Sequence, residues 1–182
     1  MYSKGQGVEQ NYEEALKWYR MAAEQNEPWA LNNLGNMYEE GEGVEQNYEE
    51  AIEWYMKAAQ LGNPGAQNNL GRIYYFGKGT GKNIPKAFEW YTKAAEGGNA
   101  KAQNSLGSMY ANGEGTEQDK FTAAQWYRKS AEQGDSDAQY NLGKMYLNGE
   151  GVMQDKEEAL RWFKKSAEQG DEDAKAMVNQ LR

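Results

Sequence analysis

The sequence predicts an all-α, right-handed α-solenoid built from helix-turn-helix repeats of 36 residues. Five tryptophans recur at this interval, and each is preceded by an alanine three positions earlier and followed by a tyrosine or phenylalanine. An internal repeat of fixed period is typical of architectures in which copies of one unit stack on each other. The tryptophans are Trp18, Trp54, Trp90, Trp126 and Trp162, and their regularity suggests that they form the stacking core.

Each repeat is expected to contain two helices, because its apolar residues recur at spacings of three and four. In the first complete repeat, one helix is expected from about Trp29 to Glu40 and another from about Tyr48 to Gln60. Gly41 and Gly43 break the chain between them. A mid-helix glycine such as Gly71 costs about 1 kcal/mol relative to alanine. We therefore expect a neighbouring group to need the space that it leaves.

The period divides the chain into units that we expect to form one elongated domain over residues 1–182. Met1 and Tyr2 match the column of Met37 and Tyr38, so the chain is expected to open in the middle of a repeat. The expected units are a partial repeat with its second helix only at 1–28, full repeats at 29–64, 65–100, 101–136 and 137–172, and a polar terminal helix at 173–182.

The repeated blocks resemble a known family. The pattern Ala-x-x-Asn-Leu-Gly-x-Met-Tyr, then a glycine-containing loop and Ala-x-x-Trp-Tyr-x-Lys-Ala-Ala, is similar to the Sel-one-like repeat, a relative of tetratricopeptide repeats. The resemblance implies a solenoid that binds a peptide or protein in a concave groove. A cysteine-rich branch of the family has been linked to penicillin binding and hydrolysis. This chain has no cysteine, so that activity is not expected here.

Composition removes several classes of chemistry. The chain contains no histidine and no cysteine, which excludes a Ser-His-Asp triad, a cysteine nucleophile, disulfides and the usual zinc sites. We expect no catalytic residue, no metal site and no cofactor. The net charge is −8, and the excess lies in residues 1–64, where 12 acidic residues face 4 basic ones. So acidic a chain is not expected to bind nucleic acid.

Two local patterns suggest chemistry at first sight. Neighbouring carboxylates such as Glu39 and Glu40 could act in acid–base catalysis if one were buried, but both are expected on solvated outer faces. The glycine-rich segment 77–82 fails the spacing of a phosphate-binding loop, and its first glycines belong to the turn columns of the repeat. We interpret the segment as a turn.

A binding surface is expected on the first helix of each repeat. If Leu34 marks the centre of that helix's buried face, about 100° per residue places a set of polar residues opposite. By resemblance to tetratricopeptide arrays, this side lines the concave groove. The candidate groove residues are Trp29, Asn32, Asn33, Asn36, Asn68, Asn69, Arg72, Tyr75, Phe76, Lys101, Asn104, Ser105, Tyr140, Asn141, Lys144 and Leu147.

The asparagines among these candidates have two interpretations, which the sequence leaves open. Asn33, Asn69 and Asn141 could pair with the backbone of an extended peptide, because an amide offers both a donor and an acceptor. Alternatively, they could bond neighbouring helices and stabilise the stack. The exposed aromatic and cationic candidates, Trp29 above all, would supply selectivity.

The predicted function is a non-enzymatic protein-protein interaction scaffold or adaptor that holds a peptide or protein in the groove. The alternative is a structural or regulatory segment of a larger repeat protein that self-associates through its uncapped first helix. No stretch approaches the roughly 18 apolar residues of a membrane span, so no membrane insertion is expected. The compartment stays open between the cytoplasm and, if a signal peptide was removed, the periplasm or the exterior.

Overall fold

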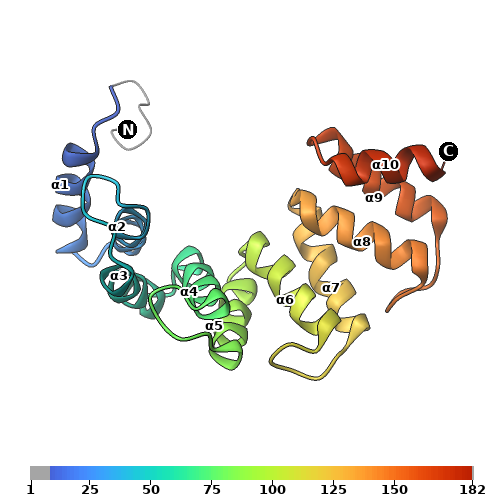
Figure 1. Cartoon of the computed structure of the whole chain (residues 1–182), viewed down its shortest axis with the longest axis horizontal. Coiled ribbons are helices and arrows are strands. Elements are labelled where there is room, and N and C mark those ends of the chain that lie inside the picture. The colour runs from blue at the N-terminus through green and yellow to red at the C-terminus, as the bar shows by residue number, and fades with distance from the viewer. Residues whose placement is uncertain (1–8, 182) are drawn as a thin grey trace. The chain divides into compact units, whose positions relative to one another are not determined.

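The computed structural model describes residues 9–181, and every regular element in this part of the chain is an α-helix (Figure 1). Met1 and Tyr2, on which the expected half-repeat opening rests, lie outside the described residues, as does Arg182. The helices are α1 Tyr12–Ala23, α2 Pro28–Glu40, α3 Tyr48–Gln60, α4 Pro64–Phe76, α5 Ile84–Glu96, α6 Ala100–Asn112, α7 Lys120–Glu132, α8 Ser136–Asn148, α9 Lys156–Glu168 and α10 Glu172–Leu181.

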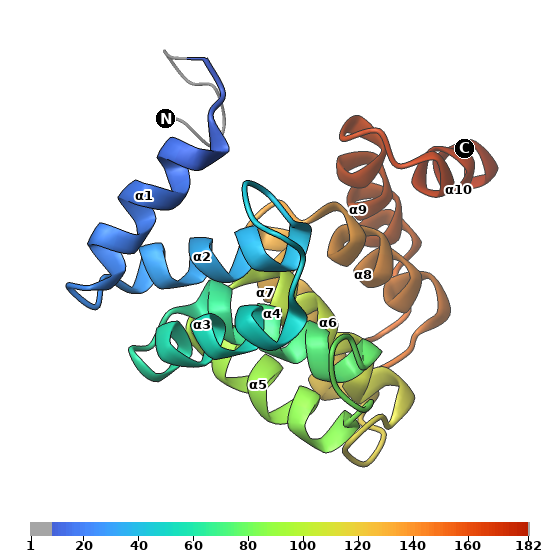
Figure 2. The same ribbon diagram turned by 60° about the vertical axis from the view of Figure 1, so that its left-hand side comes forward.

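The helices belong to two compact units, one of residues 1–97 with α1 to α5 and one of residues 98–182 with α6 to α10. Within each unit, every helix packs on the next one along the chain, as Figures 1 and 2 show. This stacking of helical hairpins confirms the predicted all-α repeat-solenoid class. A single domain over residues 1–182 stays a prediction.

The helix ends are fixed by columns that keep the repeat period. An asparagine or aspartate precedes each second helix of a repeat, and its side chain accepts hydrogen bonds from backbone N–H groups of the first turn. These caps are Asn11, Asn47, Asn83, Asp119 and Asp155. The first helices end at glycines whose positive φ strains other residues, namely Gly41, Gly77, Gly113 and Gly149. The predicted break after Glu40 is therefore confirmed.

Close packing within a hairpin depends on a glycine column that faces an aromatic column. A Cβ atom added to Gly71 would lie 2.6 Å from Cδ1 of Tyr91, and one added to Gly35 would lie 2.5 Å from Cδ1 of Tyr55. The same pairing recurs between Gly107 and Tyr127 and between Gly143 and Phe163. The expectation that a neighbour needs the space of the mid-helix glycines is confirmed, and the neighbour is an aromatic ring.

The tryptophans do not form the uniform stacking core that their regularity suggested. Trp18 is 52% exposed and Trp162 only 8%, while the other three are half-buried. A lysine three residues later lies over each ring from the second repeat onward. The distances from Nζ to the ring centroid are 4.2 Å for Lys57 on Trp54, 4.5 Å for Lys93 on Trp90, 4.1 Å for Lys129 on Trp126 and 4.2 Å for Lys165 on Trp162. The residue after each tryptophan is the more buried one, although Tyr19, which follows Trp18, is only half-buried.

Candidate functional site

The predicted groove residues of α2 and α4 meet in a hydrogen-bonded cluster, which we call the asparagine network: Asn32, Asn36 and Asn69. The amide nitrogen of Asn69 lies 3.2 Å from Oδ1 of Asn32 and 3.1 Å from Oδ1 of Asn36, and donates to both. These bonds join the first helices of successive repeats, which supports the interpretation that Asn69 stabilises the stack. Asn33 and Asn68 are half-buried, and their side chains make no hydrogen bond within residues 9–181.

A carboxylate is buried beside this network, where the sequence analysis placed a solvated one. Glu39 is 2% exposed, and its Oε2 accepts from the hydroxyl of Tyr55 at 2.9 Å and from the guanidinium of Arg72. Nζ of Lys78 lies 3.9 Å from Oε1. The expected solvation of Glu39 is therefore wrong. The 100° periodicity of α2 alone takes no account of Arg72 on α4 and Tyr55 on α3, which cover the carboxylate.

The hydroxyl of Tyr55 links the carboxylate to the asparagine network, since it also lies 2.7 Å from Oδ1 of Asn36. Burial, followed by the negative charge of Glu39, raises the pKa of Tyr55 above its ordinary value. Burial alone would lower the pKa of Arg72, but its hydrogen bond and attraction to Glu39 outweigh that effect and raise it. The structure therefore holds Tyr55 neutral and Arg72 charged around one buried anion.

We expect Tyr55→Phe to make the protein less sensitive to alkali. A hydroxyl whose folded-state pKa is raised contributes its full stability below the unfolded pKa of about 10, and loses it as the pH rises further. The difference in free energy of unfolding between wild type and Tyr55→Phe should shrink by about 1.4 kcal/mol per pH unit above that value. Urea unfolding between about pH 8 and 11 measures it. Tyr110→Phe, in the second unit, is the control, and a pH-independent difference for Tyr55→Phe would contradict the expectation.

The aromatic candidates of the first unit lie in two places. Tyr75 and Phe76, at the end of α4, meet edge to face with ring centroids 5.1 Å apart, and Phe76 is 62% exposed. Trp29 is 52% exposed, and its ring meets Tyr19 of α1 edge to face at 5.9 Å. These contacts link Trp29 to α1, and no contact described within residues 9–181 brings it to the asparagine network.

The candidates in the second unit form a simpler arrangement. Asn141 donates to Oδ1 of Asn104 at 3.2 Å, which again joins successive first helices. Tyr140 lies between Phe163, with ring centroids 5.6 Å apart, and the ammonium of Lys144, 5.5 Å from its centroid. Leu147 packs against the core of α9 and α10, Ser105 is half-buried, and Lys101 is exposed.

Two features escaped the sequence analysis although the sequence carried a signal for each. The column of Glu39 holds Tyr75, Ala111 and Leu147 in the other repeats, and this lack of any other charge indicated a position that is at least partly covered. The lysines that cover the tryptophans also recur with the period of 36 residues. Their spacing of three residues within a helix places each beside its ring.

Residues 9–181 contain no group of three or more potential metal ligands. None of the helices described there is both long enough and apolar enough to cross a membrane.

A family model of the Sel1 repeat matches residues 1–27, 30–63, 64–99, 100–135 and 136–171, in register with the predicted units to within two residues. The chain belongs to the Sel1 repeat family. The Sel1 repeat is a protein-interaction repeat type. A search of curated proteins gave no match.

Solved structures of Sel1 repeat proteins are similar to this chain. A protective antigen of uropathogenic Escherichia coli is 42% identical with a TM-score of 0.90, over 99% of this chain and 38% of the antigen. A Sel1 repeat protein from Oxalobacter formigenes is 41% identical with a TM-score of 0.89, over 96% of this chain and 71% of that one. Cysteine-rich protein B of Helicobacter pylori is 29% identical with a TM-score of 0.58, over 72% of this chain and 95% of that one. The chain therefore spans little more than a third of the first of these proteins.

Proposed function

We propose that this Sel1 repeat protein is a non-enzymatic adaptor, which holds a peptide segment of a partner protein on the exposed side of α2 and α4. The single observation that carries the proposal is the buried carboxylate of Glu39, which fixes the guanidinium of Arg72 beside the asparagine network. Burying a charge costs stability. The other repeats carry the uncharged residues Tyr75, Ala111 and Leu147 at the position of Glu39, so the stack does not need a carboxylate there. Such a cost is typical of a functional site.

The arrangement offers groups that suit an extended peptide. Arg72 keeps 31% of its side chain exposed, and the bond to Glu39 uses only one of its five N–H donors. Asn68 and Phe76 stand four residues to either side of Arg72 on α4, so the three share one helix face. A partner could place a carbonyl or carboxylate oxygen on Arg72, backbone groups on Asn33 and Asn68, and an apolar side chain on Phe76.

Panning a random peptide display library against the full chain tests this proposal. We expect selected peptides to bind wild type and to lose binding to Phe76→Ala. Phe121→Ala is the matched control, because Phe121 of α7 is 63% exposed against 62% for Phe76. Both changes remove an exposed ring, so their effects on folding should be alike. If no selected peptide distinguishes Phe76→Ala from Phe121→Ala, the proposed site is wrong.

Self-association through the first helix is a second candidate function, and one observation favours it. Trp18 and Met21 of α1 are 52% and 47% exposed, whereas the later repeats carry a tryptophan covered by lysine at the same two positions. Exposed apolar pairs of this kind often mark contact surfaces. Light scattering over a range of protein concentrations, with Met21→Lys as the comparison, separates this candidate from a monomeric adaptor.

A further inference from the structure

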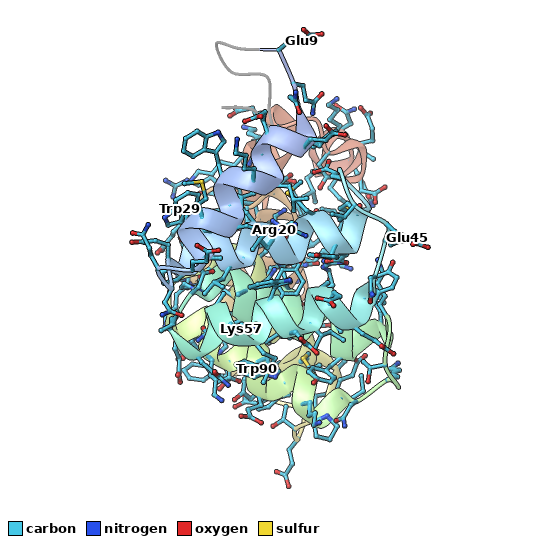
Figure 3. All side chains as sticks on the ribbon, turned by 90° about the vertical axis from the view of Figure 1, so that its left-hand side faces the viewer. Glu9, Arg20, Trp29, Glu45, Lys57 and Trp90 are labelled. Atoms are coloured by element: carbon cyan, nitrogen blue, oxygen red, sulfur yellow. The ribbon has the colours of Figure 1, made fainter. Side chains whose placement is uncertain are left out.

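A cleft in the first unit is lined by residues other than those of the proposed peptide surface. It has a volume of about 590 Å³, within the usual range of roughly 300–1,000 Å³ for ligand sites. Its lining includes Arg20 and Glu24 at the end of α1, Leu31 and Tyr38 of α2, and Trp54 and Lys57 of α3. None of these is a candidate groove residue. In Figure 3, Arg20 and Lys57 are labelled on the face of the unit that α1 and α3 present to the viewer.

The cleft gathers positive charge in the most acidic part of the chain. Residues 1–64 contain only four basic residues, and Arg20 and Lys57 are two of them. The guanidinium of Arg20 donates to the hydroxyl of Tyr38 at 3.1 Å, and Nζ of Lys57 lies 4.2 Å from the centroid of Trp54. Neither cation forms an ion pair with a carboxylate of residues 9–181. Both charges are therefore held in place without an ion pair, and Glu24 is the one carboxylate among the lining residues.

One lining position of the cleft is apolar in this repeat and polar in the later full repeats. The position of Leu31, which is 2% exposed, holds a glutamine in each later repeat. Gln67 donates to the carbonyl oxygen of Ala59 at 3.2 Å, and Gln139 to that of Ala131 at 3.1 Å. Leucine offers no polar group there, so the apolar part of the lining consists of the half-buried Trp54 and, behind the surface, the nearly buried Leu31.

We propose that this cleft binds a short acidic segment of a partner protein. A glutamate or aspartate carboxylate accepts hydrogen bonds from Arg20 and Lys57, and a neighbouring aliphatic side chain packs over Trp54 toward Leu31. The surrounding carboxylates repel such a segment elsewhere on residues 1–64. The two cations therefore favour an acidic segment, and the surrounding carboxylates restrict it to the cleft.

The second unit supplies a matched control. Arg128 donates to the hydroxyl of Tyr146, and Lys165 lies over Trp162, at positions three repeats after their counterparts in the cleft. Gln139 replaces Leu31 there, and its Oε1 accepts from the amide of Gln169 at 2.8 Å. The two places share their cations and aromatic rings; they differ at the position of Leu31 and in the tryptophan, because Trp162 is only 8% exposed and Trp54 is half-buried.

The test uses a fluorescent octapeptide of alternating glutamate and leucine, with glutamine-leucine and lysine-leucine versions for comparison. By fluorescence anisotropy on the full chain, we expect the glutamate peptide alone to bind, and binding to weaken with salt. Arg20→Gln with Lys57→Gln should weaken it about tenfold or more. Arg128→Gln should leave it unchanged, and Phe76→Ala should do the same, which keeps this site separate from the proposed peptide surface.

A charge-reversed variant guards against loss of folding as the explanation. Arg20→Glu with Lys57→Glu should reject the glutamate peptide and bind the lysine peptide. The indole N–H resonance of Trp54, assigned with Trp54→Phe, should shift when the glutamate peptide is added to wild type. Equal binding of the glutamine peptide, equal loss in Arg128→Gln, or no effect of the glutamine substitutions would overturn the proposal.

Discussion

Replacing Arg72 by methionine is expected to destabilise the protein by about 3–5 kcal/mol, the range typical of removing one partner from a buried charge pair. The carboxylate of Glu39, which is 2% exposed, would lose its guanidinium partner and keep Tyr55 as a hydrogen-bond donor, with Lys78 3.9 Å away. Methionine fills similar space, so the loss reports the missing charge more than a cavity. Urea unfolding at neutral pH measures the change.

The two partners should not be equivalent in this experiment. Glu39→Gln leaves Arg72 with access to water, because 31% of its side chain is exposed, and it should therefore cost less than Arg72→Met. Adding Arg72→Met to Glu39→Gln should then have a smaller effect than Arg72→Met alone, which a double-mutant cycle detects. Arg128→Met, at an exposed arginine, should change stability by no more than about 0.5 kcal/mol. Additive effects of the two changes would show that the pair does not act as a unit.

Gly71→Leu is expected to destabilise the protein by about 3 kcal/mol through overpacking. The first carbon of any side chain at this position lies 2.6 Å from the ring of Tyr91, which is itself 5% exposed and cannot turn toward solvent. A leucine would have to push α4 and α5 apart, and the loss of their packing should lower the melting temperature.

The control for this change is Gly81→Ala. A Cβ atom at Gly81 has no heavy atom within 4 Å, so the substitution should alter stability by no more than about 0.5 kcal/mol. Equal melting temperatures for Gly71→Leu and wild type would contradict the packing that the glycine and aromatic columns describe.

Local sequence signals predicted the helices well because each repeat carries its own. The expected bounds of the helix from Tyr48 to Gln60 agree with α3. At the expected break, α2 ends at Gly41, whose backbone takes the left-handed conformation. These features depend on neighbouring residues along the chain and on a pattern repeated several times. A periodic sequence therefore specifies its hairpins almost completely.

Burial was harder to predict, because in a stack it is set by residues from other repeats. A helical wheel of α2 places Glu39 among exposed residues, yet Arg72 and Tyr55 from the following helices cover it. Nor could such a wheel show that the amide of Asn69 donates its hydrogen bonds to Asn32 and Asn36. The cleft lined by Arg20 and Lys57 escaped prediction for the same reason, since three helices build it.

The bond between Glu39 and Arg72 also has a consequence for how such an array can change its length. The helix caps lie inside each copy, so the removal of one copy would leave the remaining helix ends intact. Deleting residues 65–100 would nevertheless bring Ser108 to the position of Arg72 and leave the buried carboxylate of Glu39 without its guanidinium partner. The repeats that contribute Glu39 and Arg72 must therefore be kept together, whereas the number of other repeats can change without breaking this charge pair.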